Sequence, residues 1–225
     1  MRKIRGKRAL LAAALAAVLA SGCGGRAGSA GFDPDESSVY IKRDGTIKSA
    51  SVERSSNDYY TAEGLEEAAA QAVSAFNEEQ AGRAQAKSGE GEEPLPVEIS
   101  QCTVKEQGGE QVLTCILDYD SADTFLAFNS RIQNPEAAFA ALSTDSVENM
   151  VARGDLVGSD FVDARGRGVE SGKVTSQGSL RAVKVQGAGL FETEGKVMYA
   201  TQGCSLTEDG GVLTPQEGVS YIIFK

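Results

Sequence analysis

The order of elements along the sequence predicts an α+β fold with a mostly antiparallel sheet, one long helix and several short helices. Three observations lead to this prediction. Two strand pairs contain two-residue turn signals, an alanine-rich run between them has helical spacing, and the last third consists of short apolar runs separated by glycine. Residues 38–225 are therefore expected to form one acidic α+β domain, and two lobes divided near residues 154–170 are the alternative.

The first strand pair and the long helix come early in the chain. The segment SVYIKRDGTIKSASVE (38–53) predicts two short strands around Asp44-Gly45, which is a strong hairpin turn signal. Thr61 is expected to cap a helix with the sequence AEGLEEAAAQAVSAFNEEQ (62–80), because apolar residues recur in it at helical spacing and glutamates occupy its first turns. The charged, glycine-rich residues 82–94 are expected to be a connector.

The second strand pair brings two cysteines together. PVEISQCTVKEQ (96–107) and EQVLTCILDY (110–119) meet at Gly108-Gly109. Counting outward from these glycines pairs Cys102 with Cys115 at a non-hydrogen-bonded position, where facing side chains lie closest. A disulfide between them is permitted outside the cytoplasm and would add about 3 kcal/mol by the chain-entropy model. Two buried thiols are the alternative.

Short helices and strands are expected in the rest of the chain. Ser121 is predicted to begin the helix ADTFLAFN (122–129), and Asn134-Pro135 the helix PEAAFAAL (135–142). A third helix is expected to begin at Ser146 and to stop at Gly154. Strand-like runs follow, and the last of them is expected to dock into a sheet: DFVDARGRG (160–168), KVTSQG (173–178), LRAVKVQG (180–187), GKVMYATQG (195–203) and VSYIIFK (219–225).

Residues 1–22 have the pattern of a bacterial lipoprotein signal peptide. MRKIRGKR carries five basic residues, a short apolar run ALLAAALAAVLA follows, and small residues precede Cys23. Ala20 stands where a lipobox usually has leucine, and an ordinary secretory peptide is the alternative. Cys23 is expected to carry a diacylglyceryl group that anchors the mature chain to the cell membrane, facing outside the cytoplasm. Residues 23–37 are expected to be a lipidated flexible tether.

Charge and composition argue against several functions. Residues 1–22 hold five of the 22 Lys+Arg and none of the 32 Asp+Glu, so the mature chain has 17 basic and 32 acidic residues, a net charge of −15. Phosphate backbones repel such a surface, so no nucleic-acid partner is expected. Histidine is absent from the sequence, which excludes Ser-His-Asp and Cys-His catalysis and histidine-ligated metals.

Two segments come close to ligand-binding motifs and fail their spacing. In LDYDSAD, Ala122 and Asp123 stand where an EF-hand loop needs a ligand and a glycine. In GRGVESGKV, Arg167 and Val174 stand where a phosphate loop needs a glycine and a hydroxyl residue. Cys204 has no predicted partner and is expected to be a small buried residue at a strand end. No catalytic, cofactor-binding or metal site is predicted.

Several pieces carry a resemblance to a protein family: SVYIKRDGTIKSASVE, DYDSADTFLAFN, SDFVDARGRGV, GKVMYATQG and SYIIFK. Over residues 36–225 the chain resembles lipoproteins of unknown function from anaerobic, gut-dwelling Gram-positive bacteria of the clostridial group. None of these pieces is a catalytic or ligand motif, so the resemblance implies only a location and a coherent fold.

The sequence leaves three functions open. The first, which the sequence favours, is a non-enzymatic surface or envelope module that presents its acidic domain to a partner; the other two are alternatives. The second is a small ligand-binding module, such as an accessory to a transporter, although the chain has no aromatic-rich stretches to line a pocket. The third is a His-independent hydrolase. An apolar cleft would favour the second function, converging carboxylates the third, and a flat surface the first.

Overall fold

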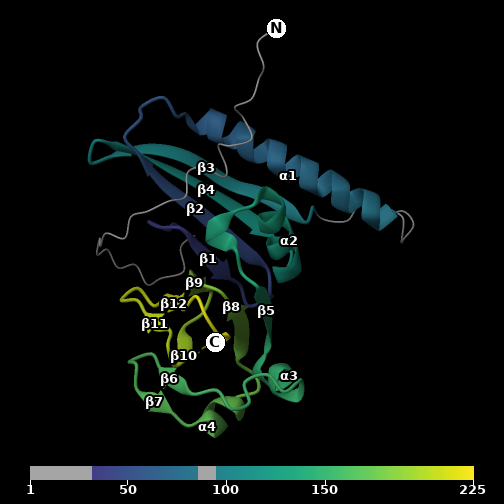
Figure 1. Cartoon of the computed structure of the whole chain (residues 1–225), viewed down its shortest axis with the longest axis vertical. Helices are drawn as coiled ribbons and strands as arrows, with labels where there is room; N and C mark the ends of the chain where they lie inside the picture. The colour runs from purple at the N-terminus through teal and green to yellow at the C-terminus, as the bar shows by residue number, and fades with distance from the viewer. Residues whose placement is uncertain (1–31, 86–94) are drawn as a thin grey trace. The chain divides into compact units, whose positions relative to one another are not determined.

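The computed structural model describes residues 32–85 and 95–225, so Cys23 and most of the expected tether and connector lie outside the described residues (Figure 1). The described residues form two units. Unit 1 contains Pro34–Ser37 and Ile47–Ala138, and unit 2 contains Ser38–Thr46 and Phe139–Lys225. Within the described part of the chain, mostly antiparallel sheets accompany four α-helices, of which one is long, and this confirms the α+β class.

Unit 1 consists of a sheet covered by the long helix. Its strands lie in the order β2 (Ile47–Ser55), β4 (Glu110–Tyr119) and β3 (Val97–Gln107), all antiparallel. Helix α1 (Ala62–Gln85) lies across this sheet (Figure 1). Helix α2 (Ala122–Ile132) and the 3-10 turn η1 (Pro135–Ala137) complete the unit.

Helix α1 begins where the sequence predicts. The hydroxyl of Thr61 accepts a hydrogen bond from the Gly64 backbone N–H at 3.1 Å, which satisfies one of the free donors at the helix start. The helix continues past the predicted end at Gln80. Its buried residues include Val73 and Phe76, and the Phe76 ring packs edge-on against Phe128 of α2 at 5.4 Å.

The β3–β4 hairpin has the predicted register near its turn. Gly108 and Gly109 have φ values of +64° and +87°, as a two-residue type I′ turn requires at both central positions. Cys102 lies opposite Cys115. The register shifts between Gln101 and Ile99. The pairs from Ile99 to Val97 are therefore displaced by one residue, and counting from the turn fails at that end of the hairpin.

Two further helix starts are confirmed. The Ser121 hydroxyl accepts a hydrogen bond from the Thr124 N–H at 3.2 Å and caps α2. The Ser146 hydroxyl accepts from the Asn149 N–H at 3.1 Å and caps α3 (Val147–Ala152). Gly154, with φ of +84°, follows α3 as the sequence predicts, because a positive φ ends a helix with little strain for glycine.

The helix predicted over residues 135–142 is wrong beyond its first turn. Asn134 caps only η1, its side chain accepting from the Glu136 N–H at 3.1 Å. The chain then enters strand β5 (Ala141–Ser146), which pairs with β8 (Arg181–Gln186). Phe139 and Leu142 are buried in this arrangement. Burial and strand pairing therefore override the helical propensity of the alanines.

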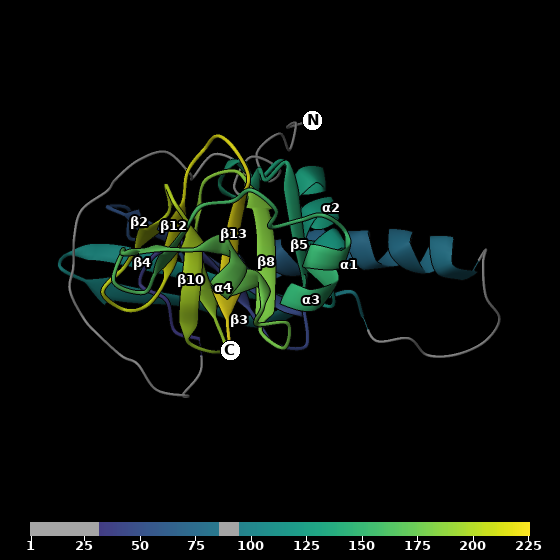
Figure 2. The same cartoon turned by 90° about the horizontal axis from the view of Figure 1, so that it is seen from below.

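Unit 2 contains a six-stranded sheet with the C-terminal strand at its centre. The order is β5, β8, β13 (Ser220–Phe224), β10 (Val197–Thr201), β6 (Phe161–Asp163) and β7 (Gly168–Val169). Figure 2 shows β13 between β8 and β10. All residues of β13 are buried, which confirms the predicted docking of the C-terminal segment. A second set of strands in unit 2 has the order β11 (Ser205–Leu206), β12 (Val212–Thr214), β9 (Gly189–Thr193) and β1 (Ser38–Ile41).

The segment KVTSQG forms a helix and not the predicted strand. Helix α4 (Ser171–Thr175) covers its first residues, and the Thr175 hydroxyl donates to the Ser171 carbonyl at 3.1 Å. Val174 is fully buried in the core of unit 2, together with Met150 of α3. One buried valine per turn suits a short helix that places only one face against a core.

We predict that truncation of the central strand destabilises the protein strongly. Ile222→Ala removes a fully buried side chain and is expected to lower the free energy of unfolding by about 2–5 kcal/mol. Val219→Ala, at an exposed position just before β13, is the control and should change it by less than about 0.5 kcal/mol. Denaturant unfolding measures both, and equal losses would contradict the central position of β13.

Candidate functional site

Unit 1 contains an apolar cavity of about 300 Å³. One face of the β2–β4 sheet forms its floor, because alternate residues of a strand point to the same side. The register sets these residues in opposite pairs, for example Ser51 against Cys115, so the floor is continuous. The floor residues are Ser49, Ser51 and Glu53 of β2 and Leu113, Cys115, Leu117 and Tyr119 of β4.

Small side chains of α1 form the opposite wall. The helix presents Leu65 and four small residues to the cavity, namely Gly64, Ala68, Ala69 and Ala72. The alanine methyl groups and the Gly64 hydrogens are too short to fill the space above the serines and leucines of the floor. The volume between the helix and the sheet therefore stays open. About 300 Å³ lies at the lower end of the range of pockets that bind small molecules.

Contacts beside the cavity fix the helix without filling the gap. The buried Asn77 side chain donates to the Val97 carbonyl at 2.8 Å and accepts from the Val97 N–H at 3.2 Å. At the other side, Gln111 donates to the Tyr60 carbonyl at 3.2 Å and accepts from the Tyr60 N–H at 3.2 Å. These paired hydrogen bonds hold both ends of the cavity wall to the sheet.

Buried polar groups around the cavity are satisfied within the protein. The Tyr119 hydroxyl, on a side chain only 1% exposed, bonds the Ser49 hydroxyl at 3.1 Å, and burial raises the pKa of Tyr119. Asn129 donates to the Phe125 carbonyl and accepts from the Asn134 amide, both at 2.9 Å. These groups are thereby satisfied, and the wall stays largely apolar.

Two carboxylates give the cavity a negative charge. Among its described lining residues, Glu53 and Glu136 are acidic and none is lysine or arginine. Glu53 is half-buried and Glu136 is exposed. Burial, together with the nearby charge of Glu136, raises the pKa of Glu53. Neither glutamate forms an ion pair within the part of the chain that the structure describes.

The structure places the two predicted disulfide cysteines face to face. The Sγ atoms of Cys102 and Cys115 lie 2.7 Å apart, and both residues are free thiols here. The hydrogen bond between them, and then burial, raises the pKa of Cys115, which lines the cavity. The same hydrogen bond lowers the pKa of Cys102. Cys204 is half-buried just after β10, with its Sγ 3.9 Å from the Thr201 hydroxyl.

The acidic segment LDYDSAD closes a strand and opens a helix. The Asp118 carboxylate pairs with Lys48 at 2.6 Å, and Ser121 caps α2. Asp120 accepts a hydrogen bond from the Ser121 hydroxyl at 3.0 Å. Across residues 32–85 and 95–225, no three His, Cys, Asp or Glu side chains converge as a metal site would require.

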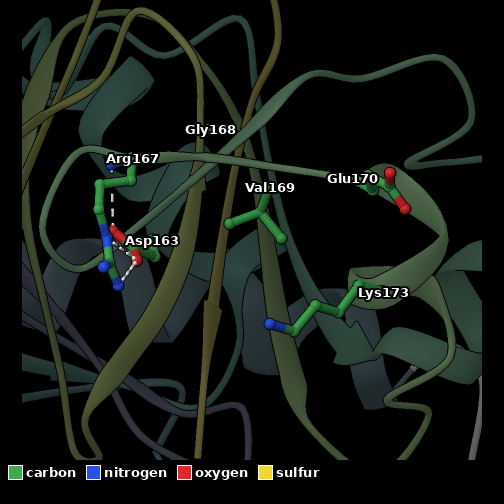
Figure 3. Close-up of a pocket in the computed structure, with 6 residues that line it drawn as sticks. All are labelled: Asp163, Arg167, Gly168, Val169, Glu170 and Lys173. Carbon is green, nitrogen blue, oxygen red and sulfur yellow. Dashed lines mark hydrogen bonds and ion pairs between the residues drawn. The ribbon is translucent and has the colours of Figure 1, made fainter.

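A second hollow, in unit 2, surrounds part of the segment GRGVESGKV. The Arg167 guanidinium bonds the Asp163 carboxylate at 2.8 Å, and this hydrogen bond lowers the pKa of Asp163 to about 2 (Figure 3). The helix after it, α4, has only five residues. With Arg167 already paired, the hollow does not have the arrangement of a phosphate loop.

Comparisons with known proteins leave the cavity to be interpreted from its own geometry. No family model, curated protein or solved structure matches the chain. In the described part of the chain, no helix is both long enough and apolar enough to cross a bilayer.

The sequence contained one signal for the cavity. The helical spacing of Ala68, Ala69 and Ala72 predicts an apolar face, and these residues do lie on the inner side of α1. Their small size is what leaves the gap above the cavity floor. Recognising it would have required the packing of α1 on β3 and β4 and the pairing of β4 with β2, which a single sequence does not reveal.

We predict that Cys102 and Cys115 are protected from alkylation in protein purified without reductant. Because their sulfur atoms already lie within contact distance, oxidation needs little rearrangement. Alkylation of the denatured protein before and after reduction, read peptide by peptide by mass spectrometry, measures this protection. Cys204 is the internal control and should react without reductant. Free thiols at both 102 and 115 would contradict the disulfide.

Proposed function

We propose that the chain is a lipid-anchored binding protein outside the cytoplasm, and that unit 1 binds a small apolar ligand. The observation that carries this proposal is the apolar cavity between α1 and the sheet. An unfilled apolar volume costs a protein stability, so its retention is best explained by a ligand that occupies it. Among the three functions left open by the sequence, an apolar cleft favours the ligand-binding module.

The surface module gains no comparable observation, and the hydrolase gains only the two glutamates of the cavity, of which Glu136 is exposed. A surface module would need an apolar patch or a charged face that matches a partner, whereas the feature found in unit 1 is concave. A hydrolase using Cys115 would need a thiolate in the cavity. The raised pKa of Cys115 keeps that thiol protonated, so it is a poor nucleophile.

The location is proposed from the signal peptide. A diacylglyceryl group on Cys23 would hold the mature chain at the membrane, and the residues between Cys23 and Pro34 would separate the folded units from the lipid. The net charge of −15 for the mature chain favours a position away from anionic headgroups. A binding protein held near the membrane could deliver its ligand to a transporter, which agrees with the accessory role.

Filling the cavity is expected to abolish ligand binding without unfolding the protein. Ala68→Leu adds a branched side chain on the cavity wall, whereas Ala70→Leu makes the same change at an exposed position of the same helix. An environment-sensitive apolar dye, titrated by fluorescence, should bind wild type and Ala70→Leu equally. Ala68→Leu should bind it about tenfold more weakly or worse, a loss of about 1.4 kcal/mol.

Thermal unfolding distinguishes a filled cavity from a destabilised fold. Ala68→Leu should unfold at or above the wild-type temperature, since each additional buried methylene contributes about 0.8 kcal/mol. Dye binding that is unchanged in a folded Ala68→Leu protein would contradict the proposed function.

The anchor is tested by changing the thiol that would carry the lipid. Cys23→Ala should leave the protein without incorporated fatty acid and shift it out of the washed membrane fraction, because no other site is expected to receive the diacylglyceryl group. The control is Cys204→Ala, the same substitution at a cysteine of unit 2. This variant should remain in the washed membrane fraction and incorporate the fatty acid as wild type does. Metabolic labelling with an alkyne fatty acid measures this. Equal labelling of both variants would contradict the anchor at Cys23.

A further inference from the structure

Two glutamates and two tyrosines are among the residues that line the cavity in unit 1. Glu53 of β2 lines the cavity, and so does Glu136. The charge of Glu136 contributes to the raised pKa of Glu53. Glu53, Glu136, Tyr59 and Tyr60 all line the cavity.

The two tyrosines form a fixed aromatic surface. Their ring centroids lie 4.5 Å apart with an interplanar angle of 37°, and the Tyr59 hydroxyl donates to the Tyr60 hydroxyl at 3.2 Å. The hydrogen bonds of Gln111 to the Tyr60 backbone hold this pair to the sheet. Tyr59 remains 66% exposed, which is unusual for a large ring that lines an apolar cavity. Most of its side chain is therefore accessible to a ligand that projects from the cavity.

Aromatic faces and carboxylates both attract positively charged ligands. The face of a tyrosine ring carries negative electrostatic potential and attracts organic cations. A carboxylate in a partly desolvated position attracts the same cation and is itself costly to leave unpaired. An anionic ligand such as a fatty acid would meet two glutamates and, in the described lining, no lysine or arginine.

We propose that the ligand of this cavity is an organic cation with an apolar body. The apolar part occupies the space between α1 and the sheet, and the ammonium group lies among Glu53, Glu136, Tyr59 and Tyr60. This inference rests on the proposed function, since it names the chemical class of the ligand for the same cavity. The net charge of −15 for the mature chain would also attract a cation over longer distances.

Three probes of equal chain length separate charge from apolar burial. Octyltrimethylammonium, octanol and octanoate are titrated into the full-length protein in detergent-free nanodiscs and measured by isothermal titration calorimetry, with empty nanodiscs subtracted. The cation is expected to bind at least about tenfold more tightly than the alcohol, and the carboxylate most weakly. Ala68→Leu should weaken the binding of every probe that enters the cavity.

Matched variants test the position of the charge. Glu53→Gln together with Glu136→Gln should reduce the affinity for octyltrimethylammonium about tenfold and leave the affinity for octanol unchanged. Glu98→Gln together with Glu110→Gln is the control, because it removes the same charge at exposed positions of β3 and β4 outside the cavity. That control should leave the binding of both probes as in wild type, apart from a small effect of net charge.

Failure of this inference differs from failure of the proposed function. If octanol or octanoate binds as tightly as the cation, or if the two pairs of variants behave alike, the cationic ligand is overturned while the apolar cavity still binds. If no probe binds wild type, or if binding survives in Ala68→Leu, the cavity is not the site and both proposals are overturned.

Discussion

The small residues on the inner face of α1 are the constraint on which unit 1 depends. A helix packed on a sheet normally fills the intervening space with leucine, valine or phenylalanine. Here Phe76 does so at one end, whereas Ala68 and Ala72 leave the middle open. Beside Phe76, Asn77 donates to the Val97 carbonyl and accepts from the Val97 N–H, and these two hydrogen bonds help to hold the helix on the sheet. Polar and apolar contacts together thus hold the helix while the gap at Ala68 and Ala72 stays open.

Such a design exchanges stability for an internal surface. A cavity wall of alanine and serine contributes little to the free energy of unfolding, and most of the buried large side chains of unit 1 lie around Tyr119, Phe125 and Phe128. Tyr119 and Phe128 also line the cavity, so the aromatic core borders the gap directly. Natural proteins commonly retain such a loss of stability where function requires it.

The sequence predicted what local chemistry determines and missed what distant contacts determine. Gly108-Gly109 set the register of the hairpin, and the hydroxyls of Thr61 and Ser121 set two helix starts, because each acts within a few residues. The segment after Pro135 became a strand because β8 lies beside it, and no local signal reports that neighbour. For the same reason Cys102 and Cys115 could be paired in advance, whereas Glu53 and Glu136 could not.

The cysteine pair connects the hairpin to the cavity in a limited way. Cys115 lies on the cavity floor, and Cys102 faces it across the strand pair. Because the β3–β4 register already holds the two sulfur atoms at 2.7 Å, closing a disulfide would move the floor little. A disulfide stabilises mainly by restricting the unfolded chain. Oxidation is therefore expected to affect how readily unit 1 unfolds, while the shape and charge of the cavity follow from α1, β2 and the two glutamates.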